Sequence, residues 1–323
     1  MKTSPLGASY PTKSALSITN LPIESDIGEP TNTTSQAISY EELNHKLGGK
    51  PMRIQLYISE KVKSVDINNK LVTTLLRLLE SVAGHVVTDE NPDIVHFFGC
   101  WDSQMAHAAT NIKRRLIPYV YSPLGGLQPW EVEYHRMAKH TQMMTFQRKM
   151  THEAAVVHVG GEMEYKNIIG KKWNGNVRII ENPLITNDIG EDEMIGQLLA
   201  LYEETIKNHD ERICASIAEK VSNIKEADES INMLLREILY AHYQLHRGGL
   251  PVLTLDNLSQ HLTKSDFDED HFAQILNDMK IDKFFARLEC VMESESTLTE
   301  GFMPTPKLED RTANKIKSSI TRY

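Results

Sequence analysis

The sequence predicts an α/β domain with a Rossmann-like parallel sheet, followed by an α-helical region. In the first part of the chain, apolar strand-like runs alternate with helix-like segments, which requires crossover connections and gives a parallel sheet covered on both faces. After Asn187, amphipathic helix patterns follow one another and no comparable strand pattern returns. We therefore expect a mostly disordered segment over residues 1–50, a Rossmann-like domain over 51–187, a helical region over 188–293, and an extended tail with a short helix over 294–323.

The composition bounds the class of protein. The chain has 323 residues, of which 40% are hydrophobic, and a formal net charge of -9; this allows a sizeable core and argues against a general nucleic-acid binder. Three cysteines, Cys100, Cys214 and Cys290, are far apart and odd in number, so neither a disulfide framework nor a CxxC metal site is indicated. The histidines lack HExxH or comparable ligand spacing, and we expect neither a metal nor a cofactor.

The sequence also indicates the cellular compartment in which the protein is expected. No stretch approaches the roughly 18 apolar residues that span a bilayer, and no apolar segment follows Lys2 at the N-terminus. Isolated cysteines fit a reducing compartment. We expect a cytoplasmic protein, with a peripheral position at the inner face of a membrane as the second option.

The first elements are a strand, a helix and a short strand. From Ile54 to residue 58, apolar residues alternate with polar ones, the two-residue period of a strand. Residues 71–82 place leucines and a valine on one helical face, and Gly84 follows where a C-terminal cap belongs. Residues 85–87 are a short strand candidate.

The next elements continue the alternation. A strand over 93–98 stops at Gly99, and Asp102 can cap a helix over 103–112. Pro129 suits the first position of a long helix that runs on to residue 153. The remaining strand candidates are 118–121, 154–159 and 177–180.

The carboxyl ends of these strands are where a ligand is expected, because open parallel sheets bind ligands at that edge. The ends are residues 99–102, 122–126, 160–162 and 181–183. Glycine recurs at three of the four ends, and two ends lead directly into helix N-termini that can receive anions. These features predict one cleft along one edge; the alternative is that the glycines only mark strand ends.

The central turn of this region is SPLGGLQPW, residues 122–130. Its two adjacent glycines, Gly125 and Gly126, allow unusual backbone angles and the close approach of a ligand to the main chain. A plain connection from strand to helix is the alternative interpretation.

Four blocks around these strand ends resemble the N-terminal half of a family 4 glycosyltransferase of the GT-B fold. In order they are PDIVHFFGCW (92–101), YVYSPLGGLQPW (119–130), AAVVHV (154–159) followed by Glu162, and VRIIENP (177–183). The resemblance stops near Ile185. Members of the family join two Rossmann-like domains, the first holding mainly the acceptor and the second the nucleotide-sugar.

The resemblance implies an acceptor site but not a complete enzyme. The family usually has a histidine where this chain has Leu124, and the glycine pair usual after the first strand is absent after Ile58. The helical second half carries no pattern of a donor domain. The acceptor-binding residues that the resemblance and the strand ends indicate are Trp101, Asp102, Ser122, Gly125, Gly126 and Glu162, and no catalytic residue is assigned.

We therefore expect a glycosyltransferase-like protein of surface polysaccharide or glycan assembly, of hexosyltransferase type. It would bind a glycan or lipid-linked sugar acceptor, and would be incomplete or dependent on a second chain that supplies a nucleotide-sugar domain. The basic and methionine-rich residues of 131–153 suit either a solvated helix face or an anionic membrane. The alternative is a non-catalytic interaction protein built on the helical half, which an exposed apolar surface on residues 190–293 would favour.

Overall fold

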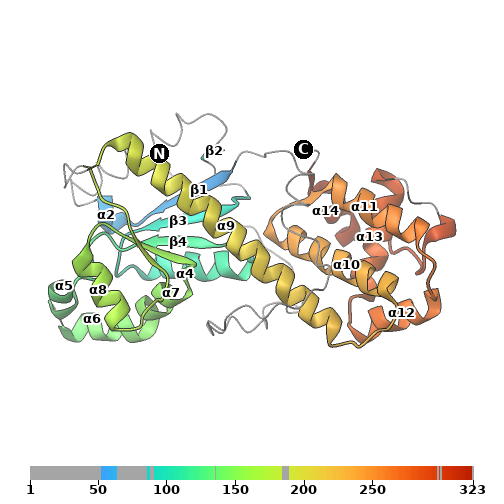
Figure 1. The fold of residues 1–323 in the computed structure, drawn as a ribbon, viewed down its shortest axis with the longest axis horizontal. Coiled ribbons are helices and arrows are strands. Elements are labelled where there is room, and N and C mark those ends of the chain that lie inside the picture. Colours follow the sequence, from blue (N-terminus) through green and yellow to red (C-terminus); the bar gives the residue numbers. More distant parts are fainter. Residues whose placement is uncertain are drawn as a thin grey trace.

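The computed structural model describes residues 52–63, 86–87, 91–134, 136–183, 189–296, 298 and 300–321. The segment expected to be disordered, 1–50, and the helix expected over 71–82 with its Gly84 cap lie outside the described residues. The chain has an α/β part and a helical part, and one long helix, α9 (Glu191–Ser222), runs from the first into the second (Figure 1).

The α/β part is built on a six-stranded sheet in the order β2-β1-β3-β4-β5-β6. Every neighbouring pair is parallel, so the predicted parallel sheet is confirmed. Each strand lies at a position that the sequence predicts. The strands are β1 (Arg53–Ile58), β2 (Val86–Val87), β3 (Ile94–Phe98), β4 (Tyr119–Ser122), β5 (Val156–Val159) and β6 (Val177–Ile179).

Helices cover both faces of this sheet. Strands β3, β4 and β5 are buried along their whole length, which explains their near-continuous apolar sequences. On one face, side chains such as Phe97 and Tyr121 pack against α4 (Ser103–Arg114), α7 (Arg148–Glu153) and α8 (Glu162–Gly170). On the other face, Ile94 and Val120 pack against α9 and α2 (Glu60–Lys63).

The start of α4 follows the sequence prediction. The Asp102 carboxylate accepts hydrogen bonds from the backbone N–H groups of Gln104 and Met105, at 2.9 and 3.2 Å. Asp102 thereby satisfies two of the four amide groups that a helix N-terminus leaves without partners. The helix begins at Ser103 because of this cap.

The single helix expected over residues 131–153 is wrong, since the segment is broken. It consists of α5 (Pro129–Glu133), α6 (Arg136–Gln142), a π-helical turn η2 (Met143–Gln147) and α7. α5 ends at Tyr134, whose extended backbone cannot continue a helix. In the π turn, Gln147 accepts from the Trp101 N–H at 2.8 Å and donates to the Tyr121 hydroxyl at 2.8 Å. The wider π turn thus places one polar side chain, that of Gln147, in the core.

α9 joins into one helix the first two of the successive helices that the sequence predicts after Asn187. Met194, Leu198 and Tyr202 in its first half belong to the core against the sheet. Ile213 and Val221 in its second half belong to the core of the helical part. The change of architecture therefore lies within α9, beyond the boundary expected between residues 187 and 188.

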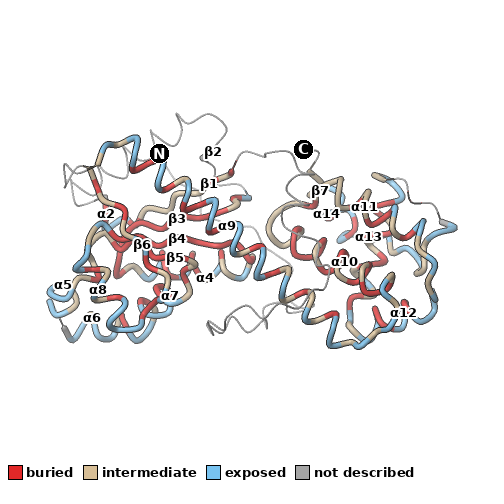
Figure 2. The backbone as a smooth tube through the Cα atoms, in the orientation of Figure 1, coloured by how far each residue is buried: buried red, intermediate tan, exposed pale blue. Residues whose placement is uncertain are grey.

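The helical part packs five further helices around one apolar core (Figures 1 and 2). They are α10 (Glu229–Arg247), α11 (Val252–Lys264), α12 (Glu269–Asp278), α13 (Asp282–Glu295) and α14 (Arg311–Ser318). In the described stretch from 189 onward, the one sheet is a two-stranded parallel pair, β7 (Leu250–Pro251) with β8 (Ile320–Thr321). The prediction of a mainly helical second half is confirmed, whereas the expectation that this half has no parallel sheet of its own is corrected by the short β7–β8 pair.

One buried arginine joins the two parts. Nη1 of Arg247 in α10 lies 2.7 and 3.0 Å from the two carboxylate oxygens of Asp210 in α9. Its Nη2 donates to the carbonyl of Asp93, the residue before β3, at 3.3 Å. Tyr243 donates to the same Asp210 carboxylate at 2.7 Å. The helical part is thus hydrogen-bonded to the amino end of the sheet.

Candidate functional site

A pocket of about 310 Å³ lies at the carboxyl ends of β3, β4, β5 and β6. The four predicted blocks meet there, which confirms the expected cleft along one edge. The described residues that line it are Phe98, Ser122, Leu124, Gly125, Gln128, His158, Gly160, Gly161, Glu162, Met163, Glu164, Ile180, Glu181, Asn182, Met194 and Leu198.

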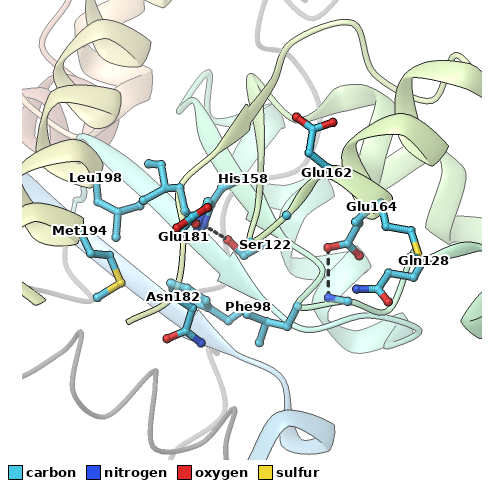
Figure 3. A pocket seen from close by; sticks show the side chains of 16 residues that line it. Phe98, Ser122, Gln128, His158, Glu162, Glu164, Glu181, Asn182, Met194 and Leu198 are labelled. Atoms are coloured by element: carbon cyan, nitrogen blue, oxygen red, sulfur yellow. Dashed lines mark hydrogen bonds between the residues drawn. The ribbon is translucent and has the colours of Figure 1, made fainter. Parts of the chain in front are cut away.

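The two sides of the pocket differ in chemistry (Figure 3). Met194 and Leu198 come from the first turns of α9 and form an apolar side. Glu162 and Glu164 come from the first turn of α8 and lie on the other side. Between them, Ser122 and His158 stand at the strand ends. The pocket can therefore contact a ligand with an apolar portion and a polar portion.

A chain of buried hydrogen bonds runs beneath the pocket and across four strands. Tyr202 OH lies 2.6 Å from His96 Nδ1, and His96 Nε2 lies 2.6 Å from Ser122 Oγ. Ser122 Oγ lies 2.6 Å from His158 Nδ1, and His158 Nε2 lies 3.1 Å from the carbonyl oxygen of Ile180. Each of these groups is hydrogen-bonded to the next.

The carbonyl of Ile180 fixes the direction of all four bonds, because a carbonyl oxygen can only accept. His158 must donate from Nε2, so its neutral ring accepts at Nδ1 and Ser122 donates to it. Ser122 then accepts from His96 Nε2–H, and His96 Nδ1 accepts from Tyr202. This assignment requires both rings to be neutral.

Burial keeps both histidine rings neutral. It lowers the pKa of His158 to about 4, although the bond to Ile180 opposes the shift. Burial lowers the pKa of His96 well below its ordinary value, and so does the repulsion that two protonated rings would exert on each other. Both rings are neutral at pH 7, and the Ser122 hydroxyl keeps one lone pair with which it can accept from a ligand at the pocket floor.

The turn over the pocket is held by Glu164. Its carboxylate accepts from the backbone N–H of Gly125 at 3.1 Å and of Leu127 at 2.8 Å. Leu124 and Gly125 have φ values of 52° and 83°, the left-handed region that favours glycine. Burial raises the pKa of Glu164 to about 7, although both backbone bonds lower it.

Glu164 was missed by the sequence reasoning, which selected Glu162 as the carboxylate of this helix turn. Glu162 does line the pocket but is exposed and pairs with Lys166 at 3.1 Å. Glu164 is buried. The one signal in the sequence was a carboxylate near the start of an amphipathic helix that follows a glycine pair. The rotation of α8 on the sheet decides whether Glu162 or Glu164 is buried, and the sequence pattern does not show this rotation.

The structure divides the six predicted acceptor-binding residues into two groups. Ser122, Gly125 and Glu162 line the pocket. Trp101, Asp102 and Gly126 do not, and each supports the structure around it: Trp101 donates from its indole to the Gly126 carbonyl at 3.0 Å, and Asp102 accepts from Ser59 at 2.6 Å and caps α4.

The reason for this division is local backbone geometry. Trp101 has a φ of 60°, which turns its ring back into the core, where it is 8% exposed. It therefore has no open face on which a sugar could stack. A Cβ on Gly126 would lie 2.5 Å from Cβ of Cys100, so this glycine is required by packing.

Among the described residues, Phe302 in the C-terminal tail is one exposed large apolar side chain, and the other six lie on the α/β part. They lie on α5, at the residue after it, on α6, η2 and α8: Trp130, Tyr134, Met137, Met144, Met163 and Ile169. None of the described residues between 190 and 293 belongs to this set. The apolar surface that would favour a scaffold built on the helical half is thus not found in the described part of that half.

The described residues hold no group of three or more His, Cys, Asp or Glu side chains that could bind a metal ion. No helix in the described part of the chain has both the length and the apolar character to cross a membrane. Comparison with protein-family models, with curated proteins and with solved structures gives no match.

Proposed function

We propose that the α/β part is the acceptor-binding half of a glycosyltransferase-like protein of glycan assembly. The observation that carries the proposal is the pocket at the carboxyl ends of β3 to β6, lined by all four sequence blocks that resemble family 4 glycosyltransferases. A pocket of about 310 Å³ is at the small end of the range that holds a compact organic ligand.

The groups in the pocket suit a hydroxyl-bearing acceptor. Ser122 can accept a hydrogen bond on its remaining lone pair, and the carboxylates of α8 can accept from sugar hydroxyls. Met194 and Leu198 can pack against apolar faces of a ligand. Several polar groups converging in a mainly apolar pocket are typical of small-molecule binding sites.

We further propose that this chain alone does not transfer sugar at a useful rate. Transfer needs donors or cations held at the leaving phosphates and an acceptor hydroxyl held in line. Leu124 cannot donate to a phosphate, and the described residues 189–321 form helices where the family has its donor domain. Loss of a single positioned donor typically costs about 10²- to 10³-fold in rate. A nucleotide-sugar domain would have to come from outside these residues.

The test is a transfer time course with the purified chain, nucleotide-sugar donors and a panel of glycoside acceptors. We expect saturable acceptor binding and no product above background. Product that appears only when a second chain is added would support the split-enzyme version. Many catalytic cycles per molecule of this chain alone would contradict the proposal, and so would a lack of binding to every acceptor.

We propose that a membrane surface is where such an acceptor is met. Met137 is 87% exposed and Met144 67%, and the neighbouring Arg148 and Lys149 are exposed. Apolar and basic side chains on adjacent helical turns suit the interface of an anionic bilayer. Sedimentation with phosphatidylglycerol vesicles, compared with phosphatidylcholine vesicles, tests this proposal. We expect the wild type to bind the phosphatidylglycerol vesicles, and we expect the double variant Met137→Ser with Met144→Ser to lose this binding. Equal sedimentation of the wild type and this double variant would contradict it.

A further inference from the structure

The Ser122 hydroxyl offers a ligand an acceptor and not a donor. Its proton is donated to His158 Nδ1, 2.6 Å away, because the other ring nitrogen of His158 donates to the Ile180 carbonyl at 3.1 Å. One of its lone pairs accepts from His96 Nε2–H at 2.6 Å. Since a hydroxyl has one proton and two lone pairs, a single lone pair remains for a ligand.

The direction of the Ser122–His158 bond is stable at neutral pH. If Ser122 turned its proton toward a ligand, its oxygen would face the bare Nδ1 of His158 with no hydrogen between the two atoms. Protonation of His158 would reverse the bond, because both ring nitrogens would then donate. Burial opposes this protonation by lowering the pKa of His158 to about 4.

The position of Ser122 makes this polarity matter for binding. Ser122 lines the pocket and stands at a strand end, between the α8 side and the apolar side formed by Met194 and Leu198 (Figure 3). It is buried, so bulk water does not solvate a mismatched ligand group placed against it. A ligand oxygen that can only accept would meet another acceptor there and stay without a partner, which is costly in buried surroundings.

We propose that His158 and the Ile180 carbonyl make Ser122 a specificity-determining residue, which selects ligands that place a hydroxyl or amino donor at the pocket floor. His158 is a positioning residue, since it acts through Ser122. The inference rests on the proposed function and narrows it: the acceptor has a free hydroxyl at this point, and the same molecule with that hydroxyl methylated or oxidised to a ketone binds more weakly.

Nitrogen-15 NMR of the histidine rings in the full chain tests the direction of the bonds without any variant. At pH 7 we expect His96 and His158 to be neutral, each with its proton on Nε2, as the bonds to Ser122 and to the Ile180 carbonyl require. A proton on Nδ1 of His158, or a doubly protonated His158 ring, would overturn the inference.

The ligand preference is measured with two probes of one ring size. Cyclohexanol can donate a hydrogen bond, and cyclohexanone can only accept. In the full chain labelled with ¹³C at the methionine methyl groups, Met163 and Met194 report on the pocket that they line, and Met137, 87% exposed and not among the described lining residues, is the control. We expect cyclohexanol to shift Met163 and Met194 saturably without shifting Met137, and cyclohexanone to bind about tenfold more weakly. Equal affinities, or no saturable shift with cyclohexanol, would contradict the inference.

A histidine variant assigns this preference to His158. His158→Leu frees the Ser122 proton to donate to a ketone, so the ratio of the cyclohexanol affinity to the cyclohexanone affinity should fall by about threefold or more. His209→Leu is the matched control, because His209 also bonds a backbone carbonyl, that of Leu116 at 3.0 Å, but lies outside the described lining; its ratio should match the wild type.

A purely structural role of His158 would weaken both probes equally and leave the ratio unchanged. An unchanged ratio in a folded His158→Leu chain would therefore overturn the inference. The ring protonation states and the wild-type ratio do not depend on the folding of this variant.

Phenyl β-glucoside and phenyl β-galactoside, titrated in the same way, separate this inference from the proposed function. If the alcohol preference and its loss in His158→Leu are observed but no glycoside binds more tightly than cyclohexanol, the acceptor function fails and the donor requirement stands. If a glycoside binds tightly and cyclohexanone binds as well as cyclohexanol, the function stands and the donor requirement is wrong.

Discussion

Ser122 Oγ lies 2.6 Å from His158 Nδ1, and the serine is the donor of this bond. The direction follows from the far side of the ring, where His158 donates to the Ile180 carbonyl at 3.1 Å. The same serine accepts from His96, so one hydroxyl joins two neutral histidines on neighbouring strands. This arrangement sets both the stability of the sheet edge and the polarity of the pocket floor.

The first prediction concerns Ser122→Ala. The change leaves the His96 Nε2–H without an acceptor and His158 Nδ1 without a donor, both in buried surroundings. An unsatisfied buried polar group costs about 1–3 kcal/mol, so we expect the free energy of unfolding to fall by about 2–4 kcal/mol. Denaturant unfolding measures it. Ser222→Ala, on an exposed helix end, is the control and should change the free energy by under about 0.5 kcal/mol. If Ser122→Ala also changed the free energy of unfolding by under about 0.5 kcal/mol, the proposed series of hydrogen bonds from Tyr202 to Ile180 would be contradicted.

The second prediction concerns the pH dependence that Glu164 produces. Its pKa is raised from 4.5 to about 7 in the folded chain, so the folded state binds more protons than the unfolded state between these values. Its contribution is fully present below about pH 4.5 and is lost as the pH rises through 7. Relative to Glu164→Gln, the wild type should lose about 3 kcal/mol of unfolding free energy over this range.

Unfolding of both proteins at several pH values between 4.5 and 8 measures this difference. Glu162→Gln, in the same helix turn but exposed, is the matched control and should run parallel to the wild type. A wild-type curve that also runs parallel to Glu164→Gln would show that the Glu164 carboxyl titrates normally.

The third prediction concerns the contact between the two parts. Arg247→Met removes the ion-pair partner of the buried Asp210 carboxylate, which among the described residues then keeps the hydrogen bond from the Tyr243 hydroxyl. Breaking a buried ion pair typically costs about 3–5 kcal/mol, and thermal or denaturant unfolding should show this loss. Arg178→Met breaks an exposed pair with Glu204 and should cost under about 1 kcal/mol. Similar losses in the two variants would mean that Arg247 does not join the parts as described.

The fourth prediction separates packing glycines from site glycines. A Cβ at Gly126 would lie 2.5 Å from Cys100 Cβ and 3.0 Å from the Pro123 carbonyl, so Gly126→Ala should destabilise the chain by about 1–3 kcal/mol. At Gly160 no atom lies within 4 Å of an added Cβ, and Gly160→Ala should be close to neutral. Equal effects of the two substitutions would refute the packing role of Gly126.

Much of the fold could be predicted because its signals are local. Apolar runs marked β3, β4 and β5, and the Asp102 cap marked the start of α4. The π turn ending at Gln147 was not predictable, since it depends on contacts of Gln147 with Trp101 and Tyr121. The continuity of α9 was also missed, because its apolar residues face two different cores.

The sequence predicted the location of the candidate site more accurately than the side chains that line it. The strand ends converge because parallel strands must end at one edge. Which side chains point into the pocket depends on single backbone angles, such as the φ of 60° that turns Trp101 into the core. The roles of Glu164 and His158 depend on burial and on bonds between distant segments, which no local pattern encodes.

The most direct test of the central claim is an acceptor-binding titration of Gly161→Phe beside Gly170→Phe. Gly161 lines the pocket with an extended φ of -177°, and no atom lies within 4 Å of an added Cβ, so the phenyl ring can fill the pocket without backbone strain. Gly170 has the same free space outside the lining. We expect glycoside binding to be lost in Gly161→Phe and retained in Gly170→Phe, with both variants folded by circular dichroism. Unchanged binding in a folded Gly161→Phe chain would contradict the assignment of the acceptor to this pocket.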